Sequence, residues 1–155
     1  MGLIRLFLLI NGLIWVTYAI SVAIKPEIFA QLVGLSLDSV MQVEVVAMYG
    51  GLQLALGIFS LLAVLMTSLV YPNLILWSLI LPLLSGFRFV ALWAAGDLFT
   101  LNFGEWGPGG YNEGALWFFE LPFALISITL LIKFKGLSRN KRRTRLNSLH
   151  LAPRF

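Results

Sequence analysis

Four long apolar runs constrain the fold of this chain more than any other feature of its sequence. They cover about residues 3–24, 41–66, 74–96 and 115–132. Each is close to, or longer than, the roughly 20 residues that a helix needs to cross a hydrocarbon core of about 30 Å. Because lipid offers no partners for backbone N–H and C=O groups, open sheets cannot span it. The sequence therefore predicts an all-α fold: an integral membrane four-helix bundle with antiparallel, up-down helices.

The low charge content supports the same class. Charged residues make up 12% of the 155 residues and hydrophobic residues 59%, whereas soluble domains carry about 25% charged residues. So little charge cannot keep the surface of a compact domain hydrated, so lipid must solvate much of the chain. The length suits one transmembrane domain, residues 1–135, and a basic tail, residues 136–155, that we expect to be disordered.

Few residue types that bind metals are present. The sequence contains no cysteine, and its only histidine is His150, in the polar tail. Disulfides, thiolate metal sites and cysteine nucleophiles are therefore excluded. Zinc and haem need nitrogen or sulfur ligands, so we predict no metal site within one protomer and assign no catalytic residue.

The first run has an alternative interpretation as a signal peptide. Arg5 would form its positive end, and Ala19, Ser21 and Ala23 would offer small residues for cleavage. The apolar stretch continues through Ile24, however, and is long enough to span a membrane. We interpret it as an uncleaved anchor, with cleavage as the alternative.

The first connection contains signals for helix starts. The residues from Pro26 onward predict a short amphipathic helix at the membrane interface, and Gly34 is expected to end it. Ser39 followed by Gln42 forms a capping-box pattern, which predicts that the second span starts there.

The other two connections differ in length. Residues 67–73 predict a short link with Pro72 as a stop signal, and the glycine-rich residues 97–113 predict a longer loop. Tryptophans near the ends of the spans are expected to anchor the chain in the headgroup layer. These are Trp77, Trp93, Trp106 and Trp117.

Basic residues are concentrated at the carboxyl end. Eight of the 11 basic residues lie at or after Lys133, whereas all seven acids lie between Glu27 and Glu120. Cytoplasmic segments of membrane proteins carry an excess of Lys and Arg, so both termini are predicted to be cytoplasmic. The tail could bind anionic lipid, or serve only to set topology. Nucleic-acid binding is not expected, because the tail offers no folded reader.

Polar residues form a stripe on the second span. At helical spacing, Tyr49, Gln53, Ser60 and Thr67 share one side. An amide or phenol in lipid costs free energy unless it is hydrogen-bonded, so this stripe should face other helices. Glu44 lies well away from Tyr49 around the helix, near the outer end, where it can reach headgroups.

Arg88 is the most informative residue of the third span. An arginine at the centre of a span costs roughly 2.5–3.5 kcal/mol and therefore needs an anion or water. Glu120 of the fourth span lies at a similar depth, so we predict an Arg88–Glu120 ion pair with Tyr49 nearby. Pro82 and Pro122 are placed to kink their helices beside it. The pair is either a clamp that fixes helix register or part of a polar pocket.

Other residues of the first two spans have two interpretations each. Asn11 and Tyr18 could complete the pocket or could form interhelical hydrogen bonds. Gly50, Gly51 and Gly57 favour close helix packing, with room for a ligand as the alternative.

The segment Glu44-x-x-Ala-Met-Tyr-Gly-Gly resembles the signature of a family of small bacterial four-helix membrane proteins, classed as a domain of unknown function. With Arg88 and Glu120, the resemblance covers roughly residues 5–135. The family pattern has an arginine where this chain has Val46, so Glu44 lacks that partner. The architecture is also similar to DoxX-like proteins, which include partners of quinone-linked oxidoreductases. The resemblance implies a fold and a bacterial inner-membrane location, and no established activity.

Three functions follow as hypotheses. The first is a non-enzymatic accessory or assembly subunit, or a binder of a small lipophilic molecule. The second is an oxidoreductase component that holds a quinone near Tyr49, Gln53, Arg88 and Glu120, with Arg88 or Tyr49 donating to a carbonyl and Glu120 relaying a proton. The third is a small transporter, which would need oligomers because four helices enclose little pore. Expected partners are the bilayer and either other subunits or further copies of the chain.

Overall fold

The computed structural model describes residues 2–33, 36, 38–96 and 114–150. The predicted loop at 97–113, the predicted helix end at Gly34 and residues 151–155 lie outside this part of the chain. The described residues are helical and contain no strand. The elements are α1 (Gly2–Ile24), α2 (Pro26–Val33), α3 (Ser39–Val45), the π-helical segment η1 (Val46–Leu52), α4 (Gln53–Leu65), α5 (Thr67–Ala95), the π-helical segment η2 (Ala115–Glu120) and α7 (Leu121–His150).

Four helical stretches in the described part of the chain are long and apolar enough to cross a membrane. This confirms the predicted all-helical class and its four long apolar helices. The stretches are Gly2–Ile24, Val40–Leu65, Thr67–Ala95 and Ala115–Gly136.

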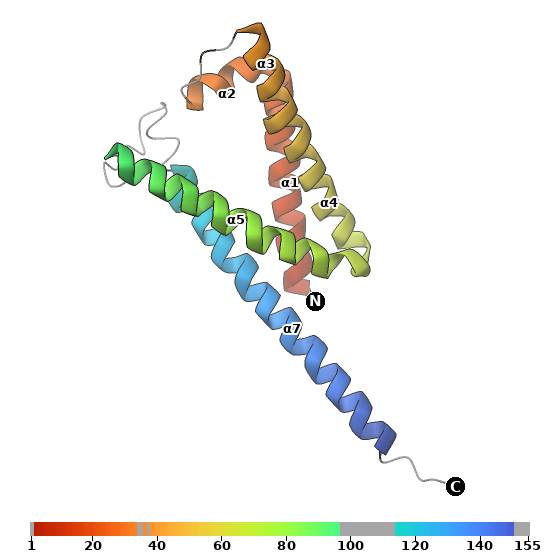
Figure 1. Ribbon diagram of the computed structural model, residues 1–155. Helices are drawn as coiled ribbons and strands as arrows, with labels where there is room; N and C mark the ends of the chain where they lie inside the picture. The colour runs from red at the N-terminus through yellow and green to blue at the C-terminus, as the bar shows by residue number, and fades with distance from the viewer. Residues whose placement is uncertain (1, 34–35, 37, 97–113, 151–155) are drawn as a thin grey trace.

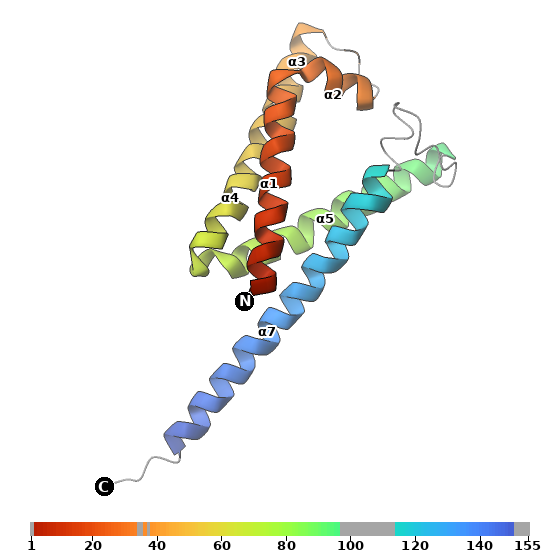
Figure 2. The same cartoon turned by 180° about the vertical axis from the view of Figure 1, so that it is seen from behind.

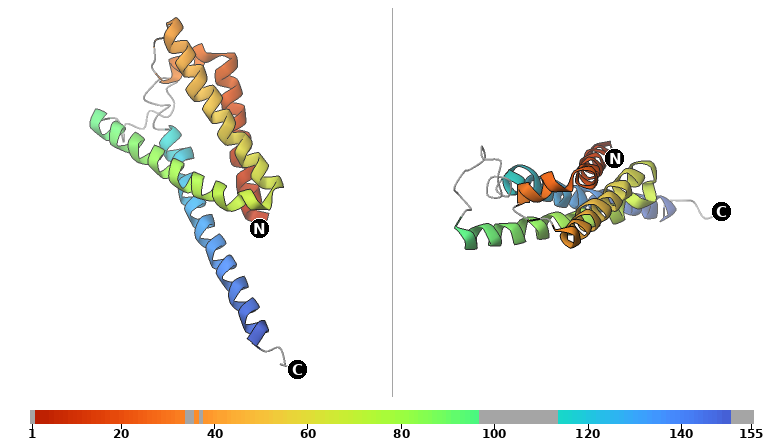
Figure 3. Two further views of the ribbon diagram at one scale, coloured as in Figure 1. Left: turned by 45° about the vertical axis from the view of Figure 1, so that its right-hand side comes forward. Right: turned by 90° about the horizontal axis from the view of Figure 1, so that it is seen from above.

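The long helices form two pairs. Figures 1 and 2 show α1 alongside η1 and α4, and α5 alongside η2 and the first part of α7. The views in Figure 3 show that the second pair crosses the first near the amino-terminal end of α1 and that the two pairs diverge away from this crossing. Near the crossing, Arg5 Nη2 donates to Thr67 Oγ1 at 3.2 Å.

Two glycines allow the backbones of α1 and α4 to approach closely. A Cβ on Gly57 would lie 2.8 Å from the backbone nitrogen of Val16, and a Cβ on Gly12 would lie 3.1 Å from the carbonyl oxygen of Gly57. Gly50 makes an ordinary contact with α1, since its Cβ would lie 3.7 Å from the carbonyl oxygen of Ala19. The structure does not support the packing role predicted for Gly51, because this residue is exposed and an added Cβ would meet no described atom within 4 Å.

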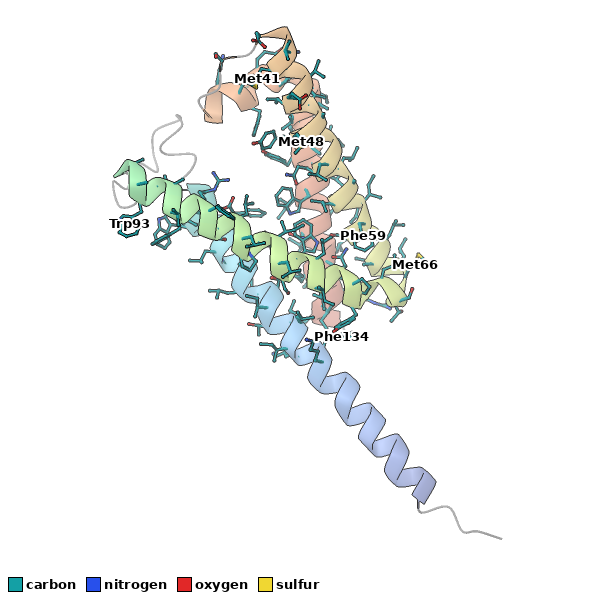
Figure 4. All side chains as sticks on the ribbon, in the orientation of Figure 1. Met41, Met48, Phe59, Met66, Trp93 and Phe134 are labelled. Carbon is teal, nitrogen blue, oxygen red and sulfur yellow. The ribbon has the colours of Figure 1, made fainter. Side chains whose placement is uncertain are left out.

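Trp77 lies in the core and not at a membrane interface. Its side chain is 0% exposed, and its Nε1 donates to Ser60 Oγ at 2.7 Å. The predicted interface role is wrong because α5 begins at Thr67, so Trp77 lies almost three turns inside the helix. Trp93, by contrast, projects from the other end of α5 and is 70% exposed (Figure 4).

The predicted link at 67–73 is also wrong. Met66, with φ −105° and ψ 104°, is the only residue between α4 and α5. Pro72 and Pro82 both lie inside α5. A proline removes one backbone hydrogen bond, which neighbouring turns of a membrane helix tolerate, so Pro72 does not act as a stop.

Two other boundaries differ from expectation. The cap of α3 is Asp38, whose Oδ1 accepts from the backbone N–H of Met41 at 2.7 Å, one residue before the predicted cap Ser39. Asp and Ser are about equally favourable at a helix N-cap, and Asp38 has the extended backbone that this position needs. At the other end, α7 continues to His150, through a segment that we expected to be disordered. Residues 137–150 contain no glycine or proline, and the Lys, Arg and Leu that dominate them favour helix.

Candidate functional site

Arg88 of α5 and Glu120 of η2 form the ion pair that the sequence predicts. Arg88 Nη2 lies 2.8 Å from Glu120 Oε1, and Arg88 Nε lies 2.9 Å from each carboxylate oxygen. The side chain of Glu120 is 4% exposed and that of Arg88 is 22% exposed. Forked guanidinium–carboxylate contacts are strong and directional, so they offset the cost of burying the carboxylate.

A cleft of about 420 Å³ opens beside this ion pair. It lies where the two helix pairs diverge, and side chains of α1, η1, α4, α5 and η2 line it. The predicted residues Tyr49, Gln53, Arg88 and Glu120 all take part, as does Tyr18. The remaining lining residues are Ile14, Trp15, Leu84, Gly114, Ala115 and Phe119.

Both π-helical segments contribute to the cleft. Tyr49 belongs to η1, and Phe119 and Glu120 belong to η2. In a π-helix each backbone hydrogen bond spans one residue more than in an α-helix, and such turns occur often at functional sites. A 3.6-residue spacing gives no hint of these segments, so they could not be predicted from the sequence.

Aromatic rings cover one side of the cleft. Trp15 makes edge contacts with Tyr18, at a centroid distance of 5.9 Å, and with Phe119, at 6.1 Å. Phe29 of α2 continues this set, with its centroid 5.8 Å from that of Tyr18 and 4.7 Å from that of Tyr49. This surface suits a flat or branched apolar molecule, because aromatic faces offer large contact area at a low cost in side-chain entropy.

Gln53 brings an unsatisfied polar atom to the cleft. Its Oε1 is buried and has no hydrogen-bond partner among the described residues. Leaving a buried acceptor unsatisfied costs about 1–3 kcal/mol, so native proteins usually supply a partner. A donor group on a bound molecule would satisfy this atom.

Two predicted contributors lie elsewhere. Asn11 is buried below the cleft and does not line it; its Oδ1 accepts from Trp15 Nε1 at 3.2 Å. Both residues belong to α1, so this bond holds the indole within one helix and is not the interhelical hydrogen bond that the sequence predicts. Glu44 is exposed on α3 and does not line the cleft.

The predicted polar stripe divides into three parts. Tyr49 and Gln53 face the cleft, whereas Ser60 is buried against α5 and Thr67 accepts from Arg5. The residues share one side of the helix only approximately, because η1 changes the rotation per residue and α4 ends at Leu65.

A second polar cluster was missed at the crossing of the helix pairs. Ser60 Oγ lies 3.4 Å from Asn73 Oδ1 and accepts from Trp77 Nε1, and all three residues are fully buried. A signal for it exists in the sequence. The pattern Asn-x-x-x-Trp occurs at residues 11–15 of α1 and 73–77 of α5, and a third time at residues 102–106, outside the described part of the chain.

The site offers hydrogen-bonding groups and an apolar wall. No group of three or more His, Cys, Asp or Glu that could hold a metal ion occurs within the described ranges. The carboxylate of Glu120 is engaged on both oxygens by Arg88, which fixes its position. This arrangement suits the binding of an amphipathic molecule that has a polar group near Gln53 and Arg88. Comparisons with protein-family models, with curated proteins and with solved structures find no match to this chain.

Proposed function

We propose that this chain is a bacterial inner-membrane protein with four antiparallel, up-down spans and both termini in the cytoplasm. Contacts along the second helix pair support the antiparallel arrangement of its two helices. Arg88 pairs with Glu120, whereas Tyr71, earlier in α5, stacks on Phe134, later in α7, at 5.7 Å. The basic residues at and after Lys133 support the cytoplasmic assignment, because Lys and Arg are retained on that side.

Its function, in this proposal, is to bind a small lipophilic molecule in the cleft, as a non-enzymatic accessory subunit. The observation that carries the proposal is the buried, unsatisfied Oε1 of Gln53 in a cleft that also holds the Arg88–Glu120 pair. The volume of about 420 Å³ falls within the range of about 300–1,000 Å³ that small-molecule sites occupy. A single polar end and an apolar body are the features that such a lining selects.

A quinone is the second candidate for the ligand. The aromatic side of the cleft, formed by Trp15, Tyr18 and Phe119, favours a flat ring. In that case Arg88 would donate to a ring carbonyl. Glu120 would then act by holding Arg88 in place, since both of its oxygens already accept from that guanidinium.

Extraction of the purified protein tests the proposal. The protein would be isolated in a mild detergent, extracted with organic solvent and analysed by mass spectrometry. We expect one lipophilic compound at close to one molecule per chain, and its mass and absorbance would identify a quinone. Repeatedly empty protein, or only the bulk lipid mixture, would overturn the proposal.

A pair of variants tests whether the extracted compound binds in the cleft. Leu84→Trp would fill the cleft, whereas Leu83→Trp places the same bulk on the neighbouring exposed position outside it. We expect only the first variant to lose the bound compound. Equal retention in both variants would place the compound elsewhere.

A further inference from the structure

A second groove lies between α1 and α7, away from the cleft. This α1–α7 groove has a volume of about 470 Å³ and is lined on α1 by Leu6 and Ile10, among others, and on α7 by Ile126 and Leu130. Its lining is apolar over most of its length. Lys133, at the carboxyl end of the lined stretch of α7, is the one charged residue in it.

The groove follows from how the helices pair. α1 packs on α4 and α7 packs on α5, so α1 and α7 are not partners of each other. They meet through the rings of Phe7 and Phe123, whose centroids are 5.9 Å apart. Beside this contact the two helices leave a channel open to the surroundings, and Leu6, Ile10 and Ile126 are all exposed.

The groove is long enough to hold part of one extended hydrocarbon chain. Its α1 side runs from Leu3 to Ile10, which is about 10 Å along a helix axis. A single acyl chain is thin enough to lie in it.

The charge at the end of the groove selects the head group. Lys133 is exposed, and its ammonium carries three donors. A positive potential at one end of an apolar channel matches a phosphate at one end of an acyl chain.

We propose that the α1–α7 groove is a binding site for an anionic phospholipid, with an acyl chain between α1 and α7 and its phosphate on Lys133. This site is separate from the cleft, and it does not depend on what the cleft binds. A lipid there would join α1 to α7, which have little direct contact.

Native mass spectrometry of the full chain tests the site. The protein would be titrated with phosphatidylglycerol and, in parallel, with phosphatidylcholine of the same acyl chains. We expect phosphatidylglycerol to bind more tightly, and Lys133→Gln to weaken it about fivefold, the factor expected for one basic residue at an anionic head group. Lys135→Gln is the matched control, because Lys135 is exposed on the same helix and does not line the groove.

A second pair of variants tests the acyl chain. Ile126→Trp fills the groove and should weaken binding of both lipids, whereas Ile128→Trp, at an exposed position outside it, should not. If Lys135→Gln weakens binding as much as Lys133→Gln, general attraction to the basic helix explains the result and the proposal fails. It also fails if Ile126→Trp and Ile128→Trp bind equally well. Leu84→Trp, which blocks the cleft, should leave phosphatidylglycerol binding unchanged, so the two sites are tested independently.

Discussion

The indole rings of Trp15 and Trp77 stack on each other, with centroids 5.4 Å apart and an interplanar angle of 22°. Trp15 belongs to the first helix pair and Trp77 to the second, so this stack joins the two halves of the molecule. Each indole N–H is also bonded, to Asn11 and to Ser60 respectively. The stack therefore fixes both the contact and the orientation of the pairs, and it lies beneath the wall of the cleft.

Trp77→Ala should destabilise the protein strongly. Removing a buried tryptophan typically costs about 3–5 kcal/mol, and the loss also leaves Ser60 without a donor. Trp93→Ala removes the same side chain from an exposed position and should have little effect. The midpoints of thermal unfolding in detergent would be measured for both variants. Equal midpoints would contradict the central role of the stack.

The Arg88–Glu120 pair should behave as a coupled unit. Glu120→Gln alone should cost about 3–5 kcal/mol, because it leaves the guanidinium without its counter-charge. Arg88→Gln alone should also destabilise. The double variant should be more stable than the sum of the single effects predicts, by about 1–3 kcal/mol.

The same cycle separates a clamp from a binding pocket. Retention of the extracted compound would be measured on the double variant, provided that it unfolds as a single cooperative transition. We expect this variant to fold and to lose the compound. A folded double variant that retains the compound would make the pair a structural clamp alone.

Gly57→Ala should lower the stability of the protein much more than Gly51→Ala, although the two glycines are only six residues apart on one span. A methyl on Gly57 would lie 2.8 Å from the backbone nitrogen of Val16, so the helices must separate. Overpacking of this kind costs about 1–3 kcal/mol. A methyl on Gly51 meets nothing within 4 Å, and the change should stay within about 0.5 kcal/mol. Equal midpoints of thermal unfolding would show that the α1–α4 contact is looser than described.

Gln53→Leu should separate stability from binding. It removes the buried Oε1 that lacks a partner, so the protein without ligand should be as stable as the parent or more stable. Retention of the extracted compound should fall, because the polar contact is lost. Gln42→Leu, at an exposed position of the same span and outside the cleft, should alter neither property. A large loss of stability in Gln53→Leu would assign the amide to the core instead.

The spans and the ion pair could be predicted because each follows from one large free-energy cost in lipid. An unpaired backbone cannot cross lipid, and an arginine inside a span must find an anion. Arg88 and Glu120 are the only two charged residues deep within the apolar runs after residue 44, so the choice of partners was narrow. Their depth could be counted from the ends of the runs.

The details that could not be predicted depend on small free-energy differences between alternative helix boundaries and rotations. Ending α4 at Leu65 and beginning α5 at Thr67 required Pro72 to lie inside a helix, which its usual cost argues against. The core position of Trp77 and the missed Asn73 both follow from that boundary. The turns η1 and η2 leave no mark in hydrophobic spacing, and the contact of Gly12 with Gly57 depends on rotation of α1 about its axis.

The single-residue link at Met66 has a mechanical consequence. It acts as an elbow between α4 and α5, and the cleft lies at the far ends of both arms. Gln53 is 13 residues from Met66, about 20 Å along the helix. A change of about 10° in the angle at the elbow would therefore displace one wall of the cleft by about 3 Å relative to the other, given that lever length. The same change would also have to shift the Trp15–Trp77 stack and the Trp77–Ser60 hydrogen bond, so these contacts hold the entrance at its present width.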